Sequence, residues 1–219
     1  MFVGVLGRRI IGGIRRPRGR KFKMGLSEKY RKSLELKWAL RLKTAIPEWG
    51  NFDGVVTHNN KSMVVFREFP EFAADGVLIL PKKHICGYRD SGFERCANAI
   101  LRDGGALDDL CAIPWLDQIE SLPQLFQEFV TRDVWPGVEV VFDDGDQSAY
   151  YIGPVLSADD RGFALCCYDS NGKWEKVYRL EYQEVARVTL GDNYTTEFNR
   201  YMRKHGADQL EKIRGRFEP

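Results

Sequence analysis

The sequence of 219 residues lacks any apolar run long enough to cross a bilayer, and it contains only 3 histidines and 5 cysteines. A membrane-spanning helix needs about 20 consecutive apolar residues, so the sequence predicts a soluble protein with no membrane partner. The odd number of cysteines and their lack of metal-ligand spacing favour free thiols in a reducing compartment, which predicts a cytoplasmic location. The adjacent Cys166 and Cys167 point to opposite faces if they lie on a strand and are poorly placed to bond each other, so we expect all five cysteines to be buried free thiols.

The motifs of nucleophilic and phosphate-transferring enzymes are also missing. No Gly-x-Ser-x-Gly elbow occurs, and none of His58, His84 and His205 lies in a pattern that pairs it with a serine or cysteine nucleophile. "GRRIIGGIRR" lacks the Lys-Ser/Thr ending and the preceding strand of a phosphate-binding loop. The acidic run at 143–146 lacks the ligand series of a calcium loop, and its flanks predict a hairpin turn. We therefore expect a protein that is not an enzyme and uses no cofactor or metal.

Acidic residues are absent from residues 1–24, although this segment carries eight of the 33 basic residues of the chain. The eight are Arg8, Arg9, Arg15, Arg16, Arg18, Arg20, Lys21 and Lys23. The remaining 25 basic residues face 31 acidic ones, so residues 25–219 carry a net charge of −6. We expect residues 1–24 to be a disordered basic tail. Three interpretations stay open: a solvated tail ahead of a true start at Met24 instead of Met1, an arm for nucleic acid or an acidic partner, and an organelle-type presequence.

The sequence does contain an internal repeat at a spacing of about 100 residues. "DGVVTHNNKSMVVFREF" (53–69) resembles "IGPVLSADDRGFALCCYD" (152–169), and residues 75–90 match residues 175–190 in their apolar positions. Two helical patterns with the same i, i+4, i+7, i+8 spacing follow, and they predict one apolar helix face in each copy. Their residues are Phe93, Ala97, Ile100 and Leu101 in the first copy, and Tyr194, Phe198, Tyr201 and Met202 in the second. The ordered series of matches predicts a duplicated chain.

Each copy is predicted as a helix, five short strands and a second helix. Residues 34–43 alternate strictly between apolar and other side chains, which predicts a half-buried strand although their composition favours helix. Helices are expected ahead of the strands, around 25–32 and at 121–131. "YDSNGKWEKVYRLEY" (168–182) predicts two strands around a tight turn. Four aromatic side chains of these strands could stack on nucleic-acid bases, but we expect them to fill a core: Trp38, Trp174, Tyr178 and Tyr182.

Short strands separated by turn residues are typical of small barrels. The pattern G-x-V…D-x-x-F-x-L and the pattern L-x-Y-x-x-V-x-x-V at 180–188 resemble strand pairs of Sm-like or SH3-like barrels. Both halves also resemble uncharacterised bacterial proteins with a glycine-plus-valine second strand and a "DGVLILP" fourth strand. The resemblance covers residues 25–213. It implies a mainly β fold with flanking helices (α+β), as two tandem five-stranded Sm/SH3-like barrels over residues 25–114 and 115–219. For Sm-like proteins it implies RNA binding, usually as rings.

Three functional hypotheses follow. The leading one is a non-catalytic binding or scaffold protein whose partner is another protein, held by barrel loops or by strand addition at an open sheet edge. The alternative is nucleic-acid binding, in which the eight basic side chains of the tail, together with Lys82 and Lys83, contact phosphates. A third is an immunity or antitoxin role, in which the acidic body of the protein neutralises a basic toxin by charge complementarity.

Overall fold

The computed structural model describes residues 25–46, 50–108, 110, 113–142 and 147–217. This part of the chain contains five α-helices and eleven strands, and all strand pairs are antiparallel. The predicted α+β class, mainly β with flanking helices, is therefore confirmed. The predicted basic tail, Cys111 and the acidic run at 143–146 lie outside the described residues. Among the described helices, none combines the length and the apolar character that crossing a bilayer requires.

The first half of the chain has the predicted order of a helix, five strands and a helix. Its elements are α1 (Leu26–Leu36), β1 (Leu40–Thr44), β2 (Asn51–Asn59), β3 (Met63–Glu68), the 3-10 helix η1 (Pro70–Phe72), β4 (Val77–Pro81), the 3-10 helix η2 (Lys82–His84), β5 (Ile85–Arg89) and α2 (Gly92–Asp103). The strands hydrogen-bond in the order β5-β1-β2-β3-β4. The last strand therefore returns to pair with the first, and β4 is left at the other edge.

The second half contains six strands where five were predicted. Its elements are the 3-10 helix η3 (Pro114–Gln118), α3 (Leu122–Thr131), β6 (Gly137–Val141), β7 (Ser148–Ile152), β8 (Val155–Ala158), β9 (Gly162–Tyr168), β10 (Trp174–Glu181), β11 (Val185–Leu190), α4 (Asn193–His205) and α5 (Ala207–Arg214). The additional strand arises because Gly153 and Pro154 interrupt one strand and separate β7 from β8. Gly153 has a φ of 151°, and a Cβ there would lie 2.0 Å from the Cys166 carbonyl oxygen.

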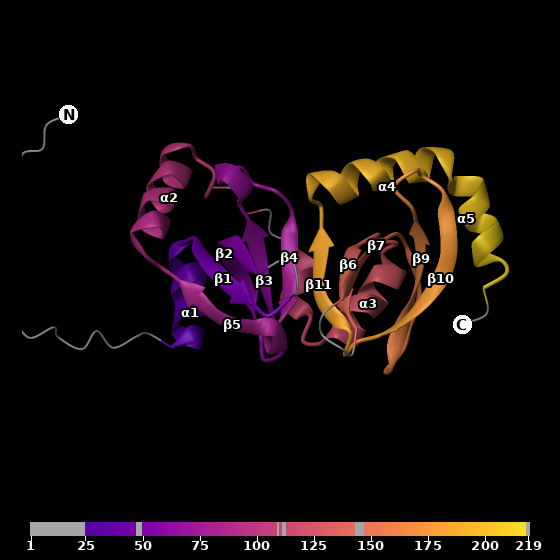
Figure 1. The fold of residues 1–219 in the computed structure, drawn as a ribbon, viewed down its shortest axis with the longest axis horizontal. Coiled ribbons are helices and arrows are strands. Elements are labelled where there is room, and N and C mark those ends of the chain that lie inside the picture. The colour runs from indigo at the N-terminus through magenta and orange to yellow at the C-terminus, as the bar shows by residue number, and fades with distance from the viewer. Residues whose placement is uncertain (1–24, 47–49, 109, 111–112, 143–146, 218–219) are drawn as a thin grey trace, which may run out of the picture.

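The two halves are joined through their strands. β4 pairs antiparallel with β11, so the strands form one eight-stranded sheet in the order β5-β1-β2-β3-β4-β11-β6-β7 and a three-stranded sheet in the order β10-β9-β8. Figure 1 shows β4 and β11 side by side at the middle of the molecule. The largest core cluster takes Val65 and Ile79 from the first half and Phe126 and Val138 from the second. The described strands thus form no closed barrel, and the sheet runs across the predicted boundary between two barrels.

The strand predicted for residues 34–43 is wrong in its first part. α1 continues to Leu36 and ends where Lys37 adopts the left-handed conformation at φ 47°, and β1 begins only at Leu40. Leu34 and Leu36 are 43% and 54% exposed, so their alternation corresponds to no buried strand face. Because no core partner stabilises a strand here, the helix propensity of leucine, glutamate and lysine prevails.

The predicted apolar face of α2 is confirmed at Leu101 but wrong at Phe93 and Ile100. Phe93 and Ile100 are exposed, and α2 packs through Leu101 and the buried amide of Asn98. The Asn98 Oδ1 accepts the Ala39 N–H at 2.8 Å, and its Nδ2 donates to the Ala39 carbonyl at 2.7 Å. A polar side chain therefore fixes this helix to the residue that precedes β1, and apolar spacing gives no signal for it.

The hairpin predicted at 168–182 is confirmed as the end of β9, a tight turn and β10. The Asp169 carboxylate accepts the N–H groups of Asn171 and Lys173, both at 2.9 Å, and so holds the turn. Cys166 and Cys167 are free and buried and pack into different core clusters, as predicted. The expectation of buried thiols is wrong for two other cysteines, which are exposed: Cys86 and Cys96.

Candidate functional site

The predicted basic pair, Lys82 and Lys83, lies in the turn between β4 and β5. The Lys82 ammonium donates to the Asn60 carbonyl in the β2–β3 turn, and the Lys83 ammonium donates to the Gln183 carbonyl in the β10–β11 turn. Burial lowers the pKa of both lysines. These contacts tie three turns together across the two halves. Phosphate binding by Lys82 and Lys83 stays a prediction, and the eight basic residues of the tail lie outside the described residues.

The outer edge of β10 has the geometry to accept an added strand. β10 pairs with β9 on one side, and no strand in the described part of the chain pairs with its other side. The Cys166 N–H on β9 donates to the Pro154 carbonyl at 3.0 Å, on the side away from β10. Since Cys166 is the register partner of Val177, this is a pair without mutual hydrogen bonds. The N–H and C=O of Val177 therefore point to the outer edge.

Charged side chains follow this edge. β10 carries four exposed charged residues, two acidic and two basic: Glu175, Lys176, Arg179 and Glu181. Charged edge strands resist unspecific pairing with other chains. These charges thus disfavour aggregation through the edge of β10, while its backbone groups can still pair with a segment of complementary charge.

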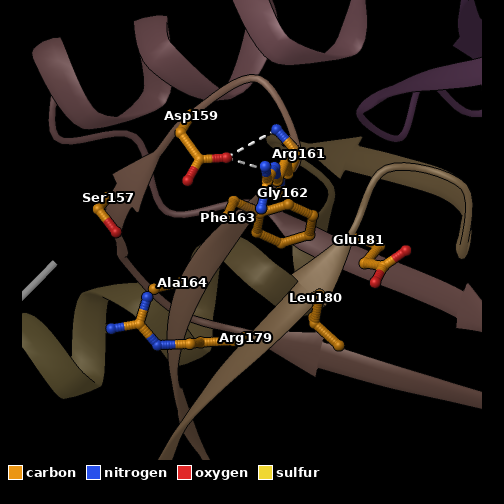
Figure 2. Close-up of a pocket in the computed structure, with 9 residues that line it drawn as sticks. All are labelled: Ser157, Asp159, Arg161, Gly162, Phe163, Ala164, Arg179, Leu180 and Glu181. Atoms are coloured by element: carbon orange, nitrogen blue, oxygen red, sulfur yellow. Dashed lines mark hydrogen bonds between the residues drawn. The ribbon is translucent and has the colours of Figure 1, made fainter.

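A pocket of about 220 Å³ opens beside the C-terminal part of β10 (Figure 2). It extends over β8, β9 and β10, where Ser157, Ala164 and Arg179 are register partners on adjacent strands. The Asp159 carboxylate accepts the N–H groups of Arg161 at 2.7 Å and Gly162 at 3.0 Å, which shapes the rim of the pocket. These two hydrogen bonds lower the pKa of Asp159, so its carboxylate is ionised at neutral pH.

The lining of this pocket carries both signs of charge. Arg161 and Arg179 contribute guanidinium groups, and Asp159 and Glu181 contribute carboxylates. The Arg179 guanidinium also lies 5.2 Å from the centre of the Phe217 ring. The pocket can hydrogen-bond polar side chains of a bound segment, but it brings together no nucleophile with a histidine. No cluster of histidine, cysteine, aspartate and glutamate that could hold a metal ion occurs among the residues that the structure describes.

Comparisons with family models, with curated proteins and with solved structures give no match to this chain. The sequence indicated that a strand edge could be open, but it did not indicate which one. The available signal was the run of charged residues along 174–181, which is typical of an edge strand. The pocket gives no signal in the sequence, because its residues come from three strands that only the pairing brings together.

Proposed function

We propose that this protein is a non-catalytic binding protein that holds an extended segment of another protein by strand addition to β10. The proposal includes two tandem Sm/SH3-like units that arose by duplication, each an open five-strand arrangement and not a closed barrel. It is supported by strand order: β5-β1-β2-β3-β4 in the first half corresponds to β11-β6-β7 followed by β8-β9-β10 in the second, if β7 and β8 count as one bent strand. α1 and α3 precede the strands of the two halves, and α2 and α4 follow them.

The observation that carries the binding proposal is the outer edge of β10, with which no other described strand pairs, beside the pocket of Figure 2. In strand addition, main-chain hydrogen bonds provide affinity, and pockets for alternate side chains provide specificity. A segment that pairs with β10 receives the outward N–H and C=O of Val177 and passes the mixed charges of Arg179 and Glu181. Its partner side chains are therefore expected to be polar.

The test uses extended peptides selected from a random library against the full chain. Val177→Pro removes the outward N–H, and Val177→Ala is the matched control because it shortens the same side chain and keeps that N–H. One hydrogen bond contributes about 0.5–1.5 kcal/mol and the proline ring adds a clash, so we expect at least about tenfold weaker binding to V177P than to V177A. Circular dichroism verifies that both variants fold. Equal affinity for the two variants would count against strand addition at β10.

Nucleic-acid binding remains the second candidate, because eight basic residues and no acidic ones lie within residues 1–24. Phosphate contacts give affinity that falls steeply with salt. Retention of the full chain on an RNA or DNA column at low salt is therefore compared with that of a chain lacking residues 1–23. Equal retention of the two chains would show that residues 1–23 are not a nucleic-acid-binding arm. An immunity role is a narrower form of the protein-binding proposal, in which the acidic residues 25–219 recognise a basic partner.

A further inference from the structure

A second cavity, of about 430 Å³, lies at the seam where the two sheets diverge. Gly153 and Pro154 end β7 in the larger sheet, and the chain continues as β8 in the smaller one. The cavity lies between β7, the end of β9, the start of β10 and α4. Six aromatic side chains line it: Tyr150, Tyr151, Tyr168, Tyr178, Tyr194 and Phe198. It shares no lining residue with the pocket of Figure 2.

The rings form two groups. Tyr151 and Tyr178, from β7 and β10, have ring centroids 4.6 Å apart and planes inclined by 39°. Under α4, the Phe198 ring lies 4.8 Å from that of Tyr194 and 6.1 Å from that of Tyr168, and it is stacked with the latter. The faces of aromatic rings carry the negative part of their quadrupole and attract cations, most strongly where water is excluded.

Carboxylates add negative charge to this aromatic lining. Glu175 and Asp169 both line the cavity, and the Glu175 Oε2 accepts the Tyr178 hydroxyl at 3.2 Å. The Asp169 pKa is lowered by backbone hydrogen bonds to its carboxylate, which is therefore ionised at neutral pH. Burial and then the charge of Glu175 raise the pKa of Tyr178, so this phenol remains neutral. The cavity thus disfavours anions.

One ring of the cavity already contacts a cation. The Lys176 ammonium lies 4.8 Å from the centroid of the Tyr178 ring, on the exposed edge of β10. Asp192 also contributes negative charge, since burial and then the charge of Asp192 raise the pKa of Tyr150. Arg187 acts in the opposite sense on Tyr150, from the face of that ring turned towards β11.

We propose that this cavity binds an alkylammonium group, either on a small molecule or on a methylated lysine of a protein. The aromatic faces contact the methyl groups, and Glu175 and Asp169 balance the charge. A quaternary ammonium suits the site better than a primary one because it carries less tightly bound water and needs no hydrogen-bond acceptor. The proposal is independent of strand addition, since Val177 is not part of the cavity.

The experiment titrates the full chain with choline and with 3,3-dimethyl-1-butanol, its uncharged isostere, and follows the tyrosine ring signals by nuclear magnetic resonance. Choline is expected to bind at least about tenfold more tightly than its isostere, because only choline gains a desolvated cation–π contact and the attraction of a carboxylate. Tyr178→Leu and Glu175→Gln should each weaken choline binding several-fold. Tyr201→Leu is the matched control, because this exposed α4 residue lies outside the cavity. Equal binding of choline and its isostere, no binding of either, or unchanged choline binding by Tyr178→Leu overturns the proposal.

A second comparison distinguishes the two sources of the ammonium group. A peptide with a central trimethyllysine is titrated beside the same peptide with unmodified lysine and beside choline. Tighter binding of the trimethyllysine peptide than of choline assigns the cavity to a protein ligand, whereas choline binding equal to or tighter than that of the peptide assigns it to a small molecule. V177P should bind choline as the unchanged protein does, so failure of strand addition and failure of this proposal are separable.

Discussion

Glu68, the last residue of β3, should make the stability of this protein fall as the pH rises through neutrality. Burial raises the pKa of its carboxyl from 4.5 to about 7. The charge of Arg187 opposes this rise, and nearby carboxylates, Asp75 first, contribute to it. The folded state therefore binds the proton of Glu68 more tightly than the unfolded state does.

The direction of this pH dependence follows from proton linkage. Below pH 4.5 both states are protonated at Glu68, and above about pH 7 both are ionised, but the folded state then holds a buried charge. The difference between the two pKa values corresponds to about 3 kcal/mol, at about 1.4 kcal/mol for each tenfold change in the proton equilibrium. Partial exposure screens this charge, so we expect a loss of about 2–3 kcal/mol between about pH 4.5 and pH 8.

The assay is urea unfolding of the unchanged protein and of Glu68→Gln across this range of pH. Glutamine keeps the size and polarity of the protonated acid but does not titrate. The difference in the free energy of unfolding between the two proteins isolates Glu68, because other groups cancel, including His84, whose pKa is lowered by burial. Glu71→Gln, at an exposed acid three residues away, is the control. Parallel stability curves for the unchanged protein and Glu68→Gln would refute the reasoning.

Four further predictions concern the fold. Glu139→Gln removes the buried carboxylate that lies 2.6 Å from the Arg187 guanidinium, and should cost about 3–5 kcal/mol in urea unfolding. Asn98→Ala removes both hydrogen bonds to Ala39 and should cost about 1–3 kcal/mol, with faster amide exchange in α2. Gly153→Ala forces a Cβ to within 2.0 Å of a β9 carbonyl oxygen. The strain should cost about 1–3 kcal/mol of stability and therefore lower the melting temperature. Finally, the β4–β11 pairing and the shared core predict that both halves unfold in one transition, and two separate calorimetric peaks would contradict this.

The local features of the fold were predictable from the sequence. The hairpin at 168–182 and the helix at 121–131 depend on turn residues and on periodicity within short segments. Turn-residue signals act between neighbours in the chain, so they depend little on the surroundings, whereas periodicity needs a core to pack against. The same reasoning failed for residues 34–43, because an alternating pattern indicates a strand only where one face meets a core.

The sequence by itself thus determined the α+β fold class and the positions of the turns, since both depend on the order of apolar and turn-forming residues. Only the tertiary structure decided that β4 pairs with β11, that no other described strand pairs with the outer edge of β10, and that the tyrosines of β7, β9, β10 and α4 surround one cavity. The physical reason is that strand pairing is set by contacts between residues far apart in the chain. Several edges of similar composition compete for each partner, and packing of the whole molecule selects among them.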